Sequence, residues 1–527
     1  MKLTAAELKN TAQWEKYNIK LPKFSIEKML AQTKEKPEWV HFGAGNIFRG
    51  FIGSINQKLL NNNDTKTGII AVETFDFDII DKIYKPFNNL TLSVVMDSKS
   101  NLDIEVLAGI ADGIKSTEFE KLKTIFENPS LKMVSYTITE KGYAIYNLDG
   151  SLMPVVAKDI ENGPGDTTHA MSVTAALLYH RYKNGAYPLA VVSMDNCSHN
   201  GEKLKNSVMK IAEAWCENNM VEAGFITYLN EKISFLWSMI DKITPRPSDA
   251  VKERLINYGI DDIEPIITSK NTYIAPFVNA ETAEYLVIED NFPNGRPPLE
   301  KAGVYMTTCE IVNKSETMKV TTCLNPLHTA LAVFGCILGY HSIWEEMNDK
   351  ELNRLVKTIA DEGIKVVVNP EIIDPKAFVT EVIDERLPNP NIPDMPQRIA
   401  TDTSQKVGIR YGETIKSYMK SSTLDTKSLN GISMAIAGWL RYLLAVDDNG
   451  NTFNRSSDPM LDELTAALKG IEYDKPESVK DQLTSILSNK ALFGIDLYEA
   501  GLGKQIETYF KSMLGGNGSV RKTLQNL

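Results

Sequence analysis

The sequence predicts an α/β protein with an N-terminal domain built on a doubly wound parallel sheet (residues 1–310) and a mainly α-helical C-terminal domain (residues 311–527). Two observations lead to this prediction. In the first half, apolar runs of strand length alternate with helical segments, which is the rhythm of βαβ units. In the second half strand signals become rare and helical patterns dominate, so we expect a domain boundary where the two regimes meet.

The expected elements follow from the apolar patterning along the chain. A first strand begins at Trp39 and runs into a glycine turn, and a helix begins near Ile47. Further strands are expected at 68–73, 90–96, 133–139 and 188–193, and a helix at 170–182. The C-terminal helices are expected at 327–341, 349–362, 372–384, 410–421, 428–445 and 459–470.

Composition narrows the class of protein. The net charge is −11 and no dense Lys/Arg run occurs, which argues against a nucleic-acid partner. The start of the chain lacks the apolar core of a signal peptide, and the longest apolar run, 327–340, is shorter than the ~18 residues of a membrane span. Five cysteines without a C-x-x-C pair indicate reduced thiols in the cytoplasm, and six scattered histidines indicate no metal site.

The stretch 39–51 predicts a Rossmann-type nucleotide site. A strand followed by a G-x-G turn and a helix lets backbone N–H groups approach a pyrophosphate. The residues expected to contact the cofactor here and after a later strand are Gly43, Gly45, Asn46, Ile47, Phe48, Arg49, Thr139 and Glu140. Glu73, or as second choice Asp76, follows the next strand and would accept a ribose hydroxyl, which favours NAD over NADP. The alternative is a tight turn and a solvated carboxylate.

A later strand ends in the polar sequence S-M-D-N-C-S-H-N-G (193–201). In open α/β sheets ligands bind beyond the carboxyl ends of the strands. Asp195, Asn196 and His199 are therefore expected at a binding site. Because Asp and Asn are also common turn residues, an ordinary turn is the alternative.

The stretch 316–340 places Lys319, Asn325 and His328 ahead of, and at the start of, a strongly apolar segment. Asn325 followed by Pro326 predicts a helix start at which the Asn side chain caps free N–H groups. An ammonium, an amide and an imidazole at the mouth of a buried helix can polarise a carbonyl and move a proton. The alternative is an ordinary capped core helix with a solvated Lys319.

Seven motifs in order resemble the polyol-specific long-chain dehydrogenase/reductase family, also called the mannitol dehydrogenase family. The motifs are H-F-G-A-G-N-I-F-R-G (41–50), T-E-K-G-Y (139–143), S-M-D-N-C-S-H-N-G (193–201), D-K-I-T-P (241–245), I-E-D-N-F (288–292), E-x-x-K with N-x-x-H (316–328) and A-G-W-L-R-Y (437–442). The third motif and the run 394–406 are most similar to members that reduce keto-uronates. The resemblance covers most of the chain, from about residue 39 to residue 445.

This resemblance implies metal-independent, NAD-dependent reduction of a ketose-type carbonyl between a Rossmann-type domain and a helical domain. The roles it implies are general acid/base for Lys319, alkoxide stabilisation for Asn196 and Asn325, proton relay for Glu316, and substrate contacts for His328 and Asp241. A lysine base needs a pKa lowered from about 10.4, and a cleft between domains can supply the desolvation. The positive end of a helix favours a neutral imidazole at His328.

One departure from the family pattern concerns spacing. In the family the asparagine lies five residues after the lysine, whereas Asn325 lies six after Lys319. An extra residue must bulge before the helix if Lys319 is to reach the same place.

A uronate substrate carries a carboxylate, which calls for a cation and preferably a planar Arg fork. Arg386, Lys406 and Arg410 are the candidates, although each also fits a structural or surface charge. They favour a small-molecule keto-uronate, with a second keto-uronate or an uncharged polyol as the alternatives. A non-catalytic NAD-binding sensor is the alternative of a different class. The oligomeric state stays open.

Overall fold

The computed structural model describes residues 1–147 and 149–527. It divides into two compact units. Unit 1 comprises Met1–Met96 and Asn101–Asn313, and unit 2 comprises Asp97–Ser100 and Lys314–Leu527. The division after Asn313 falls inside one helix, α11 (Cys309–Met318), a few residues beyond the boundary expected from the sequence.

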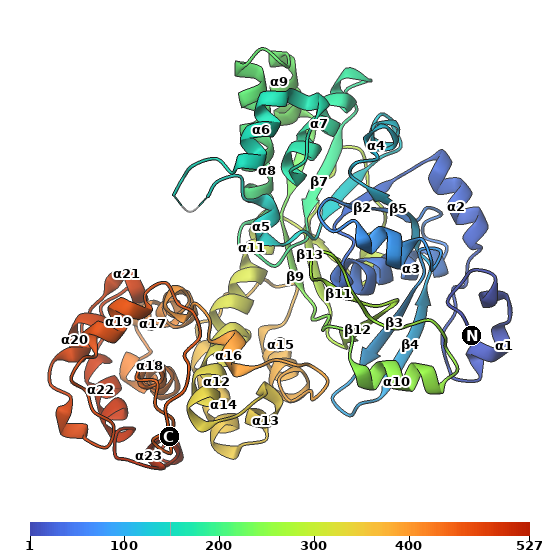
Figure 1. The fold of residues 1–527 in the computed structure, drawn as a ribbon. Coiled ribbons are helices and arrows are strands. Elements are labelled where there is room, and N and C mark those ends of the chain that lie inside the picture. Colours follow the sequence, from blue (N-terminus) through green and yellow to red (C-terminus); the bar gives the residue numbers. More distant parts are fainter. Residues whose placement is uncertain (148) are drawn as a thin grey trace. The chain divides into compact units, whose positions relative to one another are not determined.

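A six-stranded parallel sheet organises unit 1 (Figure 1). Its strands are β1 (Trp39–Phe42), β2 (Ile69–Glu73), β5 (Ile110–Lys115), β6 (Met133–Tyr136), β7 (Leu189–Ser193) and β8 (Ile233–Leu236). The order β5-β2-β1-β6-β7-β8, with every neighbouring pair parallel, is the doubly wound order of a Rossmann-type domain. The predicted fold class is confirmed.

Both faces of this sheet are buried, and the side chains alternate between two cores. On β2, Ile69 and Ala71 enter one hydrophobic cluster, whereas Ile70 and Val72 enter the other. Helices α7 and α8 cover the second face, where Trp215 is fully buried. This two-sided burial explains why the strands read as continuous apolar runs in the sequence.

The helices of unit 1 connect and cover these strands. They are α1 (Thr11–Glu15), α2 (Ile26–Glu35), α3 (Gly53–Asn61), α4 (Phe119–Phe126), α5 (Thr139–Tyr143), α6 (Pro154–Asn162), α7 (Ala170–Lys183), α8 (Asn200–Glu217), α9 (Ala223–Glu231) and α10 (Asp249–Asn257). The helix expected at 170–182 is α7.

Unit 1 contains further sheets that the βαβ pattern did not predict. Their strands are β3 (Thr91–Met96), β4 (Leu102–Leu107) and β12 (Phe277–Glu281); β9 (Ser238–Asp241), β13 (Tyr285–Glu289) and β14 (Tyr305–Thr307); and the pair β10 (Ile266–Ile267) with β11 (Tyr273–Ile274). The strand expected at 90–96 therefore exists, but its place in the doubly wound sheet was wrong. It pairs with β4 and β12 instead.

From Lys314 onward the described residues of unit 2 form helices and connecting loops, without a strand. These helices are drawn from yellow to red in Figure 1. They are α12 (Asn325–Leu338), α13 (Ile343–Met347), α14 (Lys350–Ile364), α15 (Pro375–Glu381), α16 (Pro396–Ile399), α17 (Glu413–Lys420), α18 (Asn430–Tyr442), α19 (Leu461–Ala467), α20 (Gln482–Leu487), α21 (Lys490–Phe493), α22 (Gly503–Ser512) and α23 (Ser519–Gln525). All six helices expected from the sequence are present, with shifted ends.

Helix α12 is the central helix of unit 2 and packs against α14, α16 and α18. Gly438 of α18 allows this approach, because a Cβ there would meet the Phe334 ring at 2.4 Å. Among the described residues, the helical stretch Cys309–Leu338 is the one with the length and hydropathy to cross a membrane, but 78% of its most apolar window is buried in the molecule. That burial is typical of the core helix of a soluble protein.

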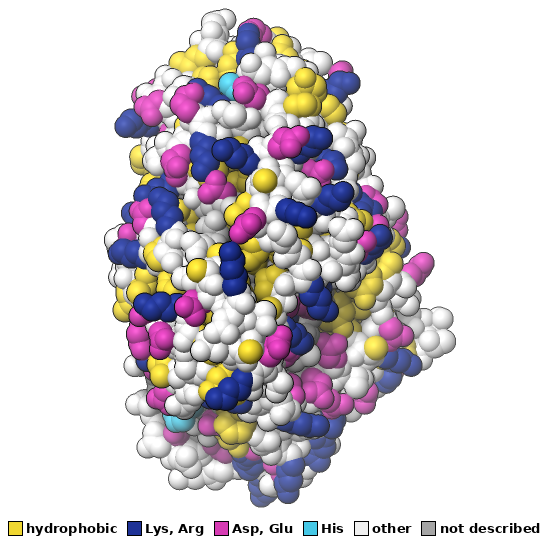
Figure 2. All heavy atoms as spheres, turned by 90° about the vertical axis from the view of Figure 1, so that its right-hand side faces the viewer, with side chains coloured by type: hydrophobic (Ala, Val, Ile, Leu, Met, Phe, Trp, Pro, Cys, Tyr) yellow, Lys and Arg dark blue, Asp and Glu magenta, His cyan; other side chains and the backbone are white. Residues whose placement is uncertain are grey.

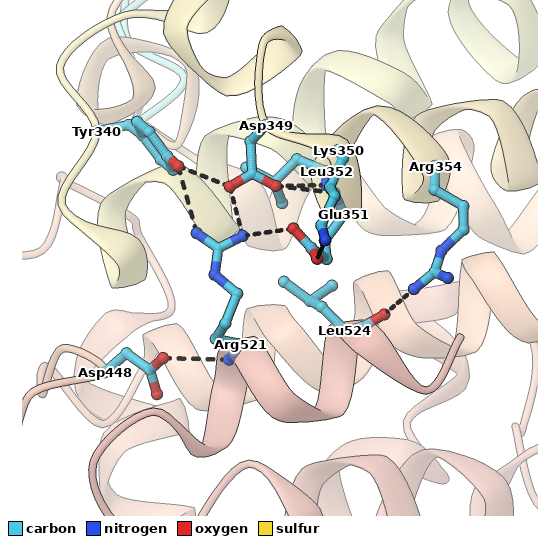
Figure 3. Close-up of polar contacts among 9 residues, drawn as sticks. All are labelled: Tyr340, Asp349, Lys350, Glu351, Leu352, Arg354, Asp448, Arg521 and Leu524. Atoms are coloured by element: carbon cyan, nitrogen blue, oxygen red, sulfur yellow. Dashed lines mark hydrogen bonds and ion pairs between the residues drawn. The ribbon is translucent and has the colours of Figure 1, made fainter.

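The C-terminal helix α23 is fastened to α14 and to the end of α12 (Figure 3). Arg521 forms ion pairs with Asp349 and with Glu351, the latter at 3.3 Å, and lies 3.3 Å from the Tyr340 hydroxyl. Arg354 donates to the carbonyl of Leu524. The last residues of the chain are thus an integral part of unit 2.

The surface carries both signs of charge. On the face shown in Figure 2, basic and acidic side chains are interspersed, and neither kind forms a large patch of one sign. On this face such mixing gives no long-range steering of a charged ligand. The net charge of −11 does not attract an anion over long range either, so attraction of an anionic ligand must be local.

The buried Glu362 makes the stability of unit 2 depend on pH. Burial raises the pKa of Glu362 to about 7, against hydrogen bonds from the Gly431 and Ile432 N–H groups at the start of α18. The pKa of Glu362 is higher in the folded than in the unfolded protein. Its contribution to the free energy of unfolding is therefore complete below about pH 4.5 and is lost as the pH rises through 7. We expect the free energy of unfolding to fall by about 3 kcal/mol from this group over that range.

Denaturant titrations between pH 5 and 8 check this expectation. The variant Glu362→Gln has no ionisable group at this position and should lose that part of the pH slope. Glu413→Gln, which removes an exposed carboxylate of the same unit, serves as the control. Equal slopes for wild type and Glu362→Gln would contradict the assignment.

Candidate active site

The predicted nucleotide turn lies where the strand order of the sheet reverses, between β1 and β6. Ligands of doubly wound sheets bind at this point. Gly43 follows β1 with φ +99°, and a Cβ there would lie 2.1 Å from the Thr137 carbonyl oxygen. Only glycine fits this position, so the main chain can turn closely past the end of β6, as a bound pyrophosphate requires.

Glu73 braces this turn. Its Oε2 accepts the Ala44 N–H at 3.0 Å, and its Oε1 accepts the N–H groups of Thr74, Phe75 and Asp76 at 3.0, 3.0 and 3.2 Å. Oε1 is therefore saturated, and Oε2 keeps one lone pair for a ribose hydroxyl. The role expected for Glu73 stays a prediction that rests on this oxygen.

Of the other residues of the turn, Phe48 and Arg49 are buried, whereas Gly45, Asn46 and Ile47 are half-buried. Phe48 stacks on His41 with 4.2 Å between ring centroids, and Arg49 donates to Thr91 and to the Ala275 carbonyl, 2.7 Å away. Desolvation lowers the pKa of Arg49 to about 10. These two side chains serve the core, so the cofactor contact predicted for Gly45, Asn46 and Ile47 is expected from their main chain.

Thr139 and Glu140 begin α5, immediately after β6. Thr139 has φ +63°, a left-handed conformation that is strained for a residue with a branched side chain. Glu140 forms an ion pair with Lys203 of α8. Their proposed contact with the cofactor stays a prediction.

The polar segment after β7 holds three predicted site residues. The Asp195 carboxylate accepts hydrogen bonds from the N–H groups of Ile138 and Thr139 and from the Tyr143 hydroxyl. Burial outweighs these bonds and raises the pKa of Asp195. Its expected contact with substrate therefore competes with three internal donors. Asn196 is exposed on this loop.

His199 and Asp241 lie at the ends of neighbouring elements. His199 adopts φ +52° just before α8, and its ring packs on Trp237 with 4.7 Å between centroids. Asp241 is the last residue of β9 and is buried. Both residues are predicted to contact substrate.

Lys319 is buried and opens a π-helical turn, Lys319–Cys323, that follows α11 and precedes α12. The Leu324 N–H donates to the Lys319 carbonyl at 3.1 Å, which is the i→i+5 bond of such a turn. A π turn holds one residue more than an α turn, so it takes up the extra residue between Lys319 and Asn325. Glu316 lies one turn earlier, in α11.

The predicted capping role of Asn325 was wrong. Leu324 occupies the cap position, without a side-chain cap, and Asn325 is the first helical residue of α12. Pro326 follows in the first turn, as expected. The Asn325 side chain is therefore not committed to capping its own helix, and the main-chain carbonyl of Asn325 accepts a hydrogen bond from the Thr329 hydroxyl at 2.9 Å.

His328 faces an acid that the sequence did not single out. Its Nε2 lies 3.2 Å from Oδ2 of Asp394, although the ring is not aligned for a hydrogen bond. Burial alone raises the pKa of Asp394, but His328 and the ion-paired Arg398 outweigh burial and lower it. Asp394 therefore stays ionised and orients His328.

The three cations suggested for a carboxylate have different surroundings. The Nη1 of Arg410 donates to the Thr329 hydroxyl on α12, and within the described residues no carboxylate pairs with Arg410. Desolvation lowers its pKa to about 10. Lys406 instead donates to the carbonyls of Ile399 and Thr401. Arg386 is buried at the end of another π-helical turn.

Four of the five predicted site cations lie in π-helical turns, and the fifth is Lys406. The described residues contain five such turns: Phe48–Ile52, Ile80–Tyr84, Lys319–Cys323, Val382–Arg386 and Gly408–Gly412. Four of them hold a predicted site cation, namely Arg49, Lys319, Arg386 or Arg410. Turns of this kind are rare and occur often at functional sites.

Two family models match the chain over nearly its whole length. The mannitol dehydrogenase Rossmann domain matches residues 37–301, and the mannitol dehydrogenase C-terminal domain matches residues 312–514. The chain belongs to the mannitol dehydrogenase family. The resemblance seen in the motifs is thereby confirmed, and the proteins compared below are dehydrogenases or oxidoreductases by name.

Individual members of the mannitol dehydrogenase family match over full length. D-mannonate oxidoreductase of Thermotoga maritima is 50% identical, with 100% of this chain and 99% of that protein covered. A D-sorbitol dehydrogenase structure is 25% identical with a TM-score of 0.78, covering 96% and 97% of the two chains. Mannitol 2-dehydrogenase of Pseudomonas fluorescens, solved with NAD and D-mannitol, is 23% identical with a TM-score of 0.72 over 100% and 99%, which shows the shared fold.

Sequence reasoning missed four residues that support the site of this mannitol dehydrogenase family member: Tyr143, Ser193, Thr329 and Asp394. Tyr143 ends the T-E-K-G-Y motif and Ser193 begins S-M-D-N-C-S-H-N-G, so their positions in motifs were a usable signal. Asp394 begins the run 394–406, which was likewise a usable signal, whereas Thr329 carried none. No cluster of three or more His, Cys, Asp or Glu side chains suited to a metal occurs among the described residues. Metal independence stays a prediction.

Proposed function

We propose that this protein is an NAD(H)-dependent oxidoreductase that interconverts fructuronate and D-mannonate. The observation that carries the substrate class is Arg410, a half-buried guanidinium without a carboxylate partner among the described residues, which contacts α12 one residue beyond His328. Its surroundings disfavour the charge, as the lowered pKa of Arg410 shows, and a sugar-acid carboxylate would compensate that charge and fit the planar fork. The 50% identical relative is named for D-mannonate.

The cofactor supported by the family and the Rossmann-type sheet is a pyridine nucleotide, and we propose NAD(H). The close turn at Gly43 suits a pyrophosphate, and the remaining lone pair of Glu73 Oε2 suits a ribose hydroxyl better than a 2′-phosphate. When bound, this group supplies or takes up the hydride.

The side chains of the protein supply the proton transfer and the stabilisation of the alkoxide. Lys319 donates a proton to the carbonyl oxygen as the alcohol forms, and removes it in the reverse direction. Asn196 and Asn325 donate hydrogen bonds to the oxygen while it carries negative charge. Glu316 relays protons to Lys319.

Substrate contacts complete the proposed mechanism. His328, oriented by Asp394, holds substrate hydroxyls, and Asp241 is a further candidate for contact with substrate. Arg410 binds the carboxylate, with Arg386 and Lys406 as further candidates. His199 is the remaining candidate for contact with substrate.

A panel of substrates followed by NADH absorbance tests this function. We expect kcat/KM for fructuronate to exceed the value for fructose by about 100-fold or more, because the ion pair to the carboxylate is lost with fructose. A preference for tagaturonate would indicate a tagaturonate reductase. A preference for fructose would indicate a mannitol 2-dehydrogenase. Equal rates with fructuronate and fructose would rule out carboxylate recognition. A parallel series with NADPH tests the cofactor, and nucleotide binding without any turnover would indicate a sensor.

A further inference from the structure

The loop after β7 carries Asn196. The residue before it, Asp195, is hydrogen-bonded to the junction between β6 and α5. Oδ2 of Asp195 accepts the Ile138 N–H at 2.8 Å and the Tyr143 hydroxyl at 2.6 Å, and Oδ1 accepts the Thr139 N–H at 3.0 Å. The strained main chain of Thr139 points its N–H at this carboxylate. The ends of β6 and β7 are thus joined by one side chain.

Tyr143 is the rigid part of this connection. Its ring is buried, its hydroxyl accepts a hydrogen bond from Ser193 at 2.7 Å, and its carbonyl accepts one from Ser207 at 2.7 Å. Burial and the neighbouring Asp195 carboxylate raise its pKa, so the hydroxyl stays protonated and donates to Asp195. The chain Ser193–Tyr143–Asp195 therefore has one defined direction of donation.

A second set of bonds holds the other side of the loop. The Asn200 side-chain amide donates to the Asp195 carbonyl at 2.9 Å and to the Ser238 carbonyl at 2.9 Å. The Ser238 N–H donates back to Asn200 at 3.1 Å. The main chain is consequently fixed before and after Asn196, although the Asn196 residue is itself exposed.

We propose that Tyr143 and Asp195 are positioning residues that fix the amide of Asn196 for stabilisation of the alkoxide. Asp195 then acts on the reaction through Asn196 and not by binding substrate. The inference rests on the proposed role of Asn196. If Tyr143 has this role, loss of its hydroxyl slows the chemical step. The hydrogen bonds from the Ile138 and Thr139 N–H groups to Asp195 still hold the junction after β6 in place.

The variant Tyr143→Phe removes only the hydroxyl and leaves the buried ring. We expect kcat to fall about 10- to 100-fold, because displacement of a catalytic group by a fraction of an ångström has effects of this size. The Kd for NADH, measured by fluorescence without substrate, should stay within about twofold. Tyr136→Phe is the matched control, because its equally buried hydroxyl pairs with Thr174, away from this loop. It should cost similar stability with kcat unchanged.

A double-mutant cycle separates positioning from a merely structural role. Asn196→Ala should lower kcat about 100-fold or more, and adding Tyr143→Phe to it should lower kcat by less than about threefold. If Tyr143→Phe has no effect, or the same effect in both backgrounds, the positioning role is overturned while the proposed function stands. If Asn196→Ala keeps full kcat, the role of Asn196 is wrong and the inference falls with it.

Discussion

Replacing Lys319 by alanine is expected to lower kcat about 1,000- to 10,000-fold and to leave the Kd for NADH within about twofold. Lys319 is the one lysine of the π-helical turn before α12, and no other lysine lies between it and His328. If it donates the proton that completes the alcohol, its loss leaves the alkoxide to be protonated by water. Nucleotide binding belongs to unit 1 and should persist. Steady-state kinetics with fructuronate and fluorescence titration with NADH measure the two quantities.

Two further variants sharpen the test of Lys319. Lys319→Arg keeps a positive charge but cannot give up a proton near neutral pH, so it should be nearly as inactive as Lys319→Ala. Added primary amines should restore part of the activity of Lys319→Ala but not of Lys319→Arg. Lys490→Ala removes an exposed lysine of the same unit and should behave as wild type. More than a tenth of wild-type kcat in Lys319→Ala would show that another group transfers the proton.

Replacing Arg410 by methionine is expected to lower kcat/KM for fructuronate about 100- to 1,000-fold. Truncation of one partner of a buried, hydrogen-bonded charge pair costs about 2–5 kcal/mol, which corresponds to this range. The effect on fructose should be much smaller, because fructose has no carboxylate. Since both substrates meet the same variant, the ratio of the two kcat/KM values cancels any general damage to the fold.

Arg410→Lys is the matched variant for this prediction. It retains a charge but loses the planar fork and the bond to Thr329, so its selectivity should fall between those of wild type and Arg410→Met. Equal losses for fructuronate and fructose would mean that Arg410 holds hydroxyls common to both sugars. In that case Arg386 or Lys406 becomes the candidate for the carboxylate.

The parts of the fold that the sequence predicted are those with short-range signals. The parallel strands are buried on both faces and read as apolar runs, and α12 reads as a buried helix behind a proline. The strand β3 was recognised, but its partner β12 lies far away in sequence, so local patterning could not assign it to the right sheet. The strand β5 escaped notice because it contains Asp112, Gly113 and Lys115 and is only partly buried.

The candidate site was predictable as a set of residues but not as a set of contacts. Asp195 was expected to bind substrate because it follows a strand, yet residue type does not reveal that three donors already surround it. Asn325 was expected to cap its helix, but the preceding π turn places Leu324 in that position. Asp394 faces His328 from the Pro-rich loop 387–397, where the sequence carries no periodic signal.

The π turn at Lys319–Cys323 has a consequence for motif definitions in this family. In an α-helix each inserted residue rotates everything that follows by about 100°, so a fixed lysine–asparagine spacing looks like a strict requirement. A turn that absorbs one residue removes this rotation locally. A search pattern that demands the asparagine five positions after the lysine would reject this chain, and an alignment without a gap here would pair Lys319 with the wrong neighbour. The signature is better written with the asparagine five or six positions after the lysine.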